Sequence, residues 1–493
     1  MTKIFKTIGM LTIALTYSLT FASNAVKAST KITILTSSLN LITDSIYVKY
    51  YDNAFLGNVL SNVPSIDTAL KIVDGKSEII LTSREIGYFS IFLKTSDANS
   101  YSLFKDVISL CPIENGNDIT IIISQNVINK HFNFEAIGNG AINLECFKDL
   151  NNIHNKRHGL PLLSKKDGFY YYNENNHIDN LYFDLENLLK NYKDKLSIPA
   201  YQLFLTDIQS ETAVEKINTF FYEIKKTDNH SKDTLLSLYK KHIQENTSYP
   251  TRNKYSKSQP VFIISDLFVK NYISDNESAY LNTYREILQQ SDSLLKDKLI
   301  ANFFYLYVNQ LKNMDSLIHD ALTKVNLKEV KQILSKYSRL ADGAKAYNFS
   351  LTNIFGKTVQ LTDFKGKIVF IDFWFTGCAP CRLFYQNQLK DVEELYKANN
   401  NIVFITISID KNFELWKKSV ASGDYTSNDV INLYTSNLGK EHPIISYYGI
   451  KSYPHPMLID KNGNLFRTNS FSEIREKDLL IKTIEQLLKS DFK

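Results

Sequence analysis

Two cysteines, Cys378 and Cys381, are separated by Ala379 and Pro380 and directly follow an apolar stretch of the chain. Thiols at positions i and i+3 in the first turn of a helix can close a disulfide ring and reopen it with little backbone movement. Unpaired amides at the start of a helix would stabilise a thiolate on Cys378. We therefore expect Cys378 to attack a disulfide and Cys381, one turn further in, to resolve the mixed disulfide that forms.

An acidic residue, Asp372, interrupts the apolar run 368–375 ahead of the cysteines. Burying a carboxylate is costly unless it has a partner, and burial should raise its pKa toward neutrality. Asp372 could then accept the proton of Cys381 as this thiol attacks. The alternative is a purely structural ion pair with a nearby lysine such as Lys367.

The dipeptide Tyr453-Pro454 precedes a short apolar segment, 457–459. A bond between any residue and proline can be cis, and a cis bond here would turn backbone groups toward the dithiol, where an extended partner chain could pair with them. Pro456 is a rival for the same role. An ordinary loop proline is the alternative interpretation of Pro454.

The elements around these side chains predict an α/β unit with a mixed sheet over residues 343–493. The run 368–375 is typical of a central strand that is covered on both faces. Further strands are expected at 401–409 and 457–459, followed by a hairpin at Asn462-Gly463. Helical spacing of apolar residues indicates two helices, one carrying Tyr385, Leu389, Val392 and Tyr396 and a final one carrying Leu480, Ile484, Leu487 and Leu488.

Residues 29–175 are predicted to form a β-rich domain, an antiparallel sandwich or barrel. Short apolar or alternating runs predict its strands, at 32–35, 78–81, 88–93 and 119–123. Cys111 and Cys146 lie in this region. They could form a structural disulfide or serve as two small buried apolar side chains, and the sequence leaves both alternatives open.

Residues 176–340 are predicted to be a helical region, which is interrupted by a polar, loop-like stretch at 246–259. Long segments with helical periodicity, such as those at 184–196, 213–226, 233–243, 280–311 and 315–337, indicate the helices. A change in composition at 341–344 marks the boundary with the α/β unit. At 493 residues the chain is long enough for several domains of this kind.

Residues 1–28 have the three parts of a secretory signal: Lys3 and Lys6, an apolar stretch at about 8–21, and small residues ending at Ala28. We expect cleavage after Ala28. The protein would then be periplasmic or otherwise exported, soluble after cleavage and membrane-anchored if the signal is retained. All four cysteines of the mature chain would then lie in an oxidising compartment.

Residues 343–493 resemble the TlpA/ResA-like thiol-disulfide oxidoreductases, a thioredoxin-fold family. The family pattern Phe-Trp-x-x-x-Cys-x-x-Cys fits Phe373 to Cys381, a buried acid is expected where Asp372 stands, and the family's cis-proline corresponds to Pro454 before Met457-Leu458-Ile459-Asp460. The resemblance implies an exported enzyme that reduces protein disulfides. Partner binding is expected at Trp374, Ala379, Pro380, Tyr453 and Pro454.

The sequence also departs from the family pattern. Gly377 replaces the tryptophan that often precedes the first cysteine, which should flatten the rim of the site. Phe384 and Gln386 stand where many members carry a glutamate and a proline. An acid or base on the helix after the cysteines is therefore in doubt, and Asp372 is the main candidate for proton transfer.

The expected partners are protein thiols and disulfides and an unidentified electron-donor thiol protein, with a redox partner at the membrane as an alternative donor. No cofactor is expected beyond the Cys378–Cys381 disulfide, and no metal, because one Cys-x-x-Cys supplies only two of the ~4 ligands of a structural zinc site. The formal net charge of +5 gives no indication of nucleic-acid binding. Two alternative functions are a peroxiredoxin-like peroxidase and a non-catalytic binding protein with a redox-active dithiol.

Overall fold

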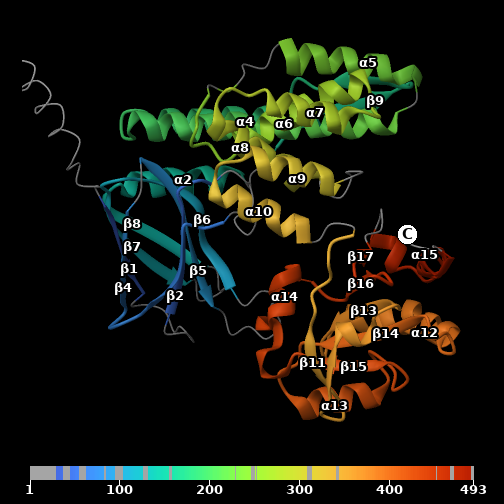
Figure 1. Ribbon diagram of the computed structural model, residues 1–493. Helices are drawn as coiled ribbons and strands as arrows, with labels where there is room; N and C mark the ends of the chain where they lie inside the picture. The colour runs from blue at the N-terminus through green and yellow to red at the C-terminus, as the bar shows by residue number, and fades with distance from the viewer. Residues whose placement is uncertain are drawn as a thin grey trace, which may run out of the picture. The chain divides into compact units, whose positions relative to one another are not determined.

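The computed structural model describes residues 29–36, 45–54, 63–82, 85–94, 104–125, 132–154, 158–227, 229–245, 250, 252–307, 314–339, 343–450, 452–466 and 471–489 (Figure 1). The predicted signal segment, 1–28, lies outside these residues. The chain forms two compact units, 1–302 and 303–493. In the part of the chain that is described, no helix has the length and apolar character needed to cross a membrane.

Two four-stranded sheets open the first unit, in the orders β4-β1-β7-β8 and β3-β2-β5-β6. Side chains from both sheets, among them Ile34, Val48, Phe89 and Ile121, share one apolar core. The predicted β-rich N-terminal region is therefore confirmed. The strands are β1 (Thr30–Leu35), β2 (Ser45–Tyr51), β3 (Ile66–Lys71), β4 (Lys76–Leu81), β5 (Ile86–Lys94), β6 (Phe104–Glu114), β7 (Asp118–Gln125) and β8 (Phe132–Asn139).

One pair of strands contradicts the prediction of a wholly antiparallel arrangement. β1 and β7 run parallel, with Ile32 beside Ile119 and Ile34 beside Ile121. Alternating apolar residues identify a strand and its buried face, but the alternation is the same for both strand directions. The direction of this pairing is therefore a property of the tertiary fold.

Cys111 on β6 and Cys146 on helix α2 (Ala141–His154) are free and fully buried. Of the two alternatives that the sequence left open, the structure has the pair of small buried side chains and not the disulfide. Burial raises the pKa of the Cys111 thiol well above its usual value and that of Cys146 to about 12. Neither thiol is thus poised to ionise at neutral pH.

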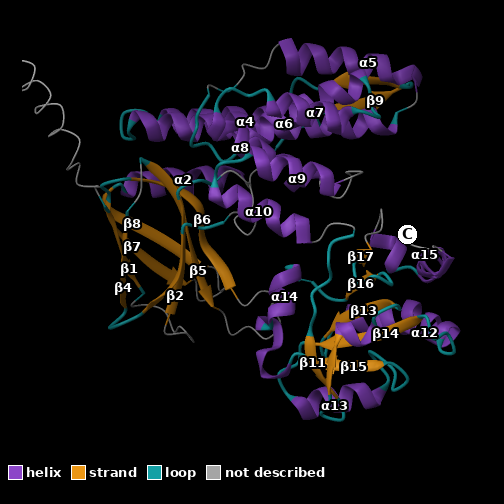
Figure 2. Ribbon diagram, in the orientation of Figure 1, coloured by secondary structure: helices purple, strands orange, loops and turns teal. Residues whose placement is uncertain are grey.

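The predicted helical region is confirmed, and a small hairpin, β9 (Leu163–Lys166) and β10 (Phe169–Tyr172), precedes it in the chain (Figure 2). The helices are α3 (His177–Lys190), α4 (Ile198–Lys226), α5 (Asn229–Tyr239) with a π-helical extension (Lys240–Glu245), α6 (Gln259–Ser274), α7 (Ala279–Leu288), α8 (Ser293–Tyr307), α9 (Met314–Lys324) and α10 (Lys328–Arg339).

Two long helices that the sequence predicted are each divided. The segment 280–311 contains α7 and α8, because the side chain of Asp292 accepts a hydrogen bond from the Leu295 amide at 3.0 Å and so caps a new helix. The segment 315–337 contains α9 and α10, which are separated at 325–327. Helix α6 lies in the predicted helical region but was not among the segments singled out there. Its buried residues surround most of the helix, so it lacks a clear apolar face.

The second unit contains the mixed sheet that the sequence predicted. This sheet has seven strands, in the order β12-β11-β15-β14-β13-β16-β17. β13, β14 and β15 are parallel neighbours, and β16 runs antiparallel to β13. All seven residues of β13 are buried, in agreement with a central strand. The strands are β11 (Ser350–Asn353), β12 (Thr358–Gln360), β13 (Ile368–Trp374), β14 (Ile402–Ser408), β15 (Ile431–Tyr434), β16 (His455–Ile459) and β17 (Leu465–Phe466).

Helices cover both faces of β13, and its side chains alternate between them. Phe370 packs with residues of α12 and α15, whereas Ile371 packs with residues of α14. This places Asp372 on the same face as Phe370. The helices that accompany this sheet are α11 (Ala379–Phe384), which continues through a π-helical turn (Tyr385–Leu389) into α12 (Lys390–Tyr396), then α13 (Phe413–Ser422), α14 (Pro443–Tyr448) and α15 (Lys477–Lys489).

Candidate active site

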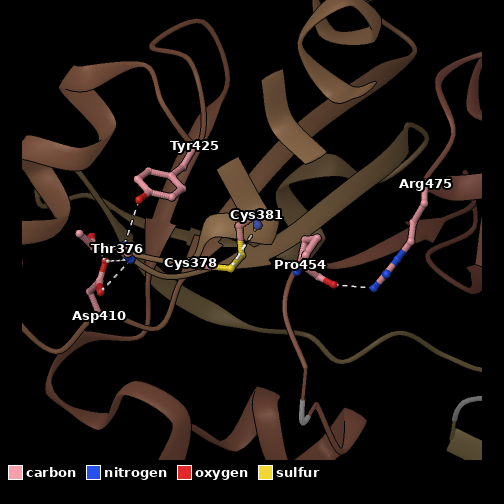
Figure 3. The surroundings of a disulfide bond; sticks show 8 residues. Thr376, Cys378, Cys381, Asp410, Tyr425, Pro454 and Arg475 are labelled. Atoms are coloured by element: carbon pink, nitrogen blue, oxygen red, sulfur yellow. Dashed lines mark hydrogen bonds between the residues drawn. A yellow bond between two sulfur atoms is a disulfide. The ribbon is translucent and has the colours of Figure 1, made fainter. Parts of the chain in front are cut away.

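The predicted cysteine pair lies where β13 ends and α11 begins. Cys378 is the N-cap residue of α11, and it forms a disulfide with Cys381 in the first turn (Figure 3). Ala379 and Pro380 lie between them and are exposed. Proline fits this turn because its missing N–H has no partner to lose at the start of a helix.

The surroundings of the two sulfur atoms differ. The Cys381 backbone N–H donates a hydrogen bond to Cys378 Sγ at 3.2 Å. Such a donor favours a thiolate on Cys378 once the disulfide is reduced. Cys378 is 4% exposed and Cys381 1% exposed, so the first cysteine is the more accessible of the two. This asymmetry agrees with an attacking Cys378 and a resolving Cys381.

The loop before Cys378 is held by residues that follow much later in the chain. Thr376 donates its hydroxyl to Asp410 at 2.7 Å, and Ser408 donates to the same carboxylate at 2.8 Å. The Gly377 N–H donates to the hydroxyl of Tyr425 at 3.0 Å. Figure 3 shows Thr376, Asp410 and Tyr425 on one side of the disulfide. Sequence reasoning identified neither Asp410 nor Tyr425.

Gly377 adopts a φ of +91°, a conformation that L side chains rarely adopt. A Cβ atom added at this position would meet nothing within 4 Å, so the backbone angle and not crowding at the Cβ position accounts for glycine. The glycine that replaces the family's tryptophan is therefore tied to a left-handed turn ahead of Cys378.

Trp374, predicted among the partner-binding residues, is 0% exposed. Its ring stacks on Tyr425, with centroids 4.9 Å apart and the planes 8° from parallel. The described structure thus leaves Trp374 no surface for direct contact with a partner. Its effect on a partner can only pass through neighbours such as Tyr425.

The peptide bond between Tyr453 and Pro454 is cis, the only cis bond among the described residues, so Pro456 is not a rival. The Arg475 guanidinium donates to the Pro454 carbonyl at 2.6 Å, on the other side of the disulfide from Tyr425 (Figure 3). The Tyr453 ring meets Phe375 edge to face, with centroids 5.6 Å apart. Pro454 is buried and Tyr453 half-buried.

Asp372 is buried as predicted, at 1% exposure. Burial raises the pKa of its carboxyl to about 8, against smaller opposing effects of Arg475 and of the backbone of Phe373 and His455. The alternative ion pair with Lys367 is absent; both residues are described, and Arg475 is the cation that acts on Asp372. A carboxyl with this pKa can take up and release a proton near neutral pH.

The fold brings Asp372 close to the helix that carries the cysteines. Along β13 it stands between Phe370 and Trp374, which point to the same face. Phe370 packs with Phe384 of α11, and Trp374 packs with Cys381 of the same helix. Asp372 therefore faces the segment of α11 that follows the resolving cysteine.

Phe384 and Gln386, which replace the family's glutamate and proline, have structural contacts. Phe384 is 7% exposed in the core, and the Gln386 side chain donates to the carbonyls of Gly423 and Asp424. A different helix carboxylate was missed. Glu393 on α12 is 7% exposed. Its position four residues after Leu389, on the apolar face of the predicted helix, was a signal for burial.

Residues 366–465 match a family model described as thioredoxin-like. A thiol-disulfide oxidoreductase ResA of Bacillus cereus is 30% identical over 145 residues, which are 29% of this chain and 78% of that protein. A ResA of Geobacillus thermodenitrificans is 30% identical over 128 residues, 26% of this chain and 67% of that protein. Among solved structures, the thioredoxin domain of a thiol-disulfide oxidoreductase from Bacteroides vulgatus is 27% identical in sequence. The match covers 30% of this chain and 96% of that one, with a TM-score of 0.26.

Proposed function

Because the chain belongs to the thioredoxin-like thiol-disulfide oxidoreductases through its C-terminal region, we propose that it reduces disulfide bonds of other proteins at its Cys-Ala-Pro-Cys motif. The observation that carries the proposal is the Cys378–Cys381 disulfide at the start of α11, beside cis-Pro454. The signal-like residues 1–28 support action outside the cytoplasm, in the periplasm or an equivalent compartment.

The first step begins from the reduced protein, with Cys378 as a thiolate. Its Sγ attacks one sulfur of a partner disulfide, forming a mixed disulfide, while the other partner sulfur leaves as a thiolate and takes a proton from water. The hydrogen bond from the Cys381 N–H to Cys378 Sγ supports this assignment, because it stabilises negative charge on that sulfur.

The second step releases the partner. Asp372 accepts the proton of the Cys381 thiol, and the resulting thiolate attacks Cys378 Sγ. The Cys378–Cys381 disulfide forms, and the second partner sulfur leaves as a thiolate that is then protonated. Two electrons have passed from the dithiol to the partner disulfide. An electron-donor thiol protein, soluble or at the membrane, must then reduce Cys378–Cys381 again.

The partner is expected to approach over the exposed Ala379 and Pro380 and along Tyr453-Pro454. An extended chain can pair with backbone groups near a cis-proline in the manner of an added β-strand. Because Arg475 already occupies the Pro454 carbonyl, this pairing would use backbone groups next to Pro454.

Trapping of a mixed disulfide tests the proposal. Cys381→Ser should hold the partner on Cys378, giving an adduct that dithiothreitol releases and that mass spectrometry identifies. Cys378→Ser, the matched control, should form no adduct and should lose insulin-reducing activity by at least about 100-fold, as expected when the nucleophile is removed. Full activity of a folded Cys378→Ser protein would refute the proposed function.

Kinetics of Asp372→Asn test the role of the carboxyl. The variant should resolve the mixed disulfide about 10- to 100-fold more slowly, since an amide cannot accept the Cys381 proton. The initial attack by Cys378 should change little. Stopped-flow measurement of the two phases with a disulfide-bonded peptide separates them, and equal slowing of both phases would argue against this role.

A further inference from the structure

A row of polar side chains crosses the sheet at Asp372, on the face that α12 and α15 cover. Asp372 on β13 lies beside Thr406 on β14, which lies beside Asn432 on β15. The three residues are 1%, 1% and 6% exposed. Polar groups are rarely buried in the middle of a sheet without a task or a network of partners.

Hydrogen bonds connect the far end of this row to Glu393. Thr406 Oγ1 donates to Asn432 Oδ1 at 2.8 Å, and Asn432 Nδ2 donates to the Ser427 carbonyl at 2.7 Å. The Ser427 hydroxyl donates to Glu393 Oε2 at 3.3 Å. Glu393 thus reaches from α12 toward the same buried polar row that begins with Asp372.

The two carboxyl groups are incompletely paired. Asp372 Oδ1 and Glu393 Oε1 are buried, and neither atom has a hydrogen-bond partner. Burial raises the pKa of Glu393 to about 8, and the charge of Asp372 contributes to the increase. The repulsion is reciprocal, so a charge on Glu393 must also oppose ionisation of Asp372. The buried oxygens are suited to a pair of acids in which at least one is protonated.

Other titratable groups around the pair come from several elements. Arg475, which precedes α15, favours ionisation of Asp372. His455 on β16 has its pKa lowered to about 4 by burial and by Arg475, so it is neutral at pH 7. Tyr385 in the π-helical turn has its pKa raised to about 12, chiefly by burial, and Asp429 adds to the increase of the Glu393 pKa.

Glu393 also has access to water. A cavity of about 460 Å³ is lined by Glu393, Tyr385, Ser427 and Asp429, together with the exposed Lys397. Asp372 does not line this cavity. Of the two acids, Glu393 is therefore the one placed to exchange protons with solvent.

We propose that Asp372 and Glu393 form a buried acid pair, in which Glu393 positions the proton of Asp372 and passes it to solvent. The inference rests on the proposed function of Asp372. Near neutral pH the two acids share one proton, and in the form that carries it on Glu393, Asp372 is a carboxylate that accepts the proton Cys381 loses as it attacks. The pair then holds two protons, and one leaves to water through Glu393, which restores the starting state.

Carboxyl titration of the oxidised full-length protein tests the pair directly. The ¹³C carboxyl signal of Asp372 is assigned as the one lost in Asp372→Asn and is followed against pH. Glu393→Gln should weaken proton binding at Asp372 by about tenfold or more, because it removes the neighbouring charge. Glu394→Gln, which changes an exposed carboxyl on the same helix, should leave the titration unchanged. Equal titration of Asp372 in both variants would overturn the proposal.

A reciprocal measurement keeps the test decisive if Glu393→Gln does not fold. Asp372→Asn should weaken proton binding at Glu393 by about tenfold or more, since coupling between two sites is mutual. An unchanged Glu393 titration in Asp372→Asn would overturn the proposal as well.

The pH profile of mixed-disulfide resolution tests the link to catalysis. Glu393→Gln should move the midpoint of the profile to lower pH, in step with the Asp372 titration, whereas a structural role alone would lower the rate equally at all pH values. A profile that does not move overturns the proton-transfer role. Failure of the proposed function is distinguishable, because the wild-type protein would then reduce no disulfide at all while the carboxyl titration stays measurable.

Discussion

The buried carboxyl group of Asp372 makes the free energy of unfolding depend on pH. Burial raises its pKa from the usual 3.8 to about 8, so between these values the folded protein keeps a proton that the unfolded chain loses. The stability that Asp372 contributes is fully present below pH ~4 and is lost as pH rises through the folded pKa. A group that serves proton transfer at neutral pH thus destabilises the fold there.

Substitution of this residue should reverse the effect. Asp372→Asn cannot ionise, so its gain in free energy of unfolding over wild type should grow by more than about 2 kcal/mol between pH 5 and pH 8.5, since one pKa unit corresponds to about 1.4 kcal/mol. Urea unfolding of the oxidised proteins measures this. Asp424→Asn, at an exposed position, should show no such growth. A gain of equal size at both pH values would contradict the assigned titration.

At the scale of elements, the loop from β13 to α11 depends on elements that follow it. Asp410, just after β14, accepts hydrogen bonds from Thr376 and Ser408. Tyr425, after α13, accepts one from the Gly377 N–H. The geometry of the strand end is therefore maintained by the neighbouring strand and by the segment after α13, and not by the Cys-Ala-Pro-Cys motif alone.

Removal of the Asp410 carboxylate should loosen this loop. Asp410→Ala should lower the free energy of unfolding by about 2 kcal/mol, because the half-buried Thr376 and the buried Ser408 lose a charged acceptor. Insulin reduction should also slow, as Cys378 becomes less well positioned. Glu414→Ala is the matched control, since this acid on α13 is exposed. Similar stability and activity of the two variants would show that the loop does not depend on Asp410.

At the scale of the whole molecule, we propose the domain limits 29–175, 176–340 and 343–493. In the described part of the chain, the strands of the seven-stranded sheet and the helices around it lie between Ser350 and Lys489. The residues assigned to catalysis also lie in this range. We therefore expect the last domain to contain everything that thiol chemistry requires.

Excision of this domain tests the limits. Residues 343–493 expressed alone should fold and reduce insulin at a rate within about threefold of the full-length protein, because all the residues assigned to catalysis lie within this range. Circular dichroism and a thermal unfolding curve establish folding. A fragment that folds but has lost most of the activity would place part of the active surface upstream of residue 343.

Much of the candidate site was predictable because its signals are local. The spacing of Cys378 and Cys381, the single acid in an apolar strand and the proline before a strand each lie within a few residues, and each has a direct physical meaning. The confirmed central strand and the final helix rest on the same kind of pattern, since backbone periodicity follows from local geometry.

The sequence by itself thus determined the fold class, the two thiols and the buried Asp372. Tertiary structure alone decided the parallel pairing of β1 with β7, the free state of Cys111 and Cys146, and the contacts of Tyr425 and Asp410 with the active-site loop. It also brought Glu393 to Asp372. These features depend on which distant segments meet, and a local pattern carries no information about distance in space.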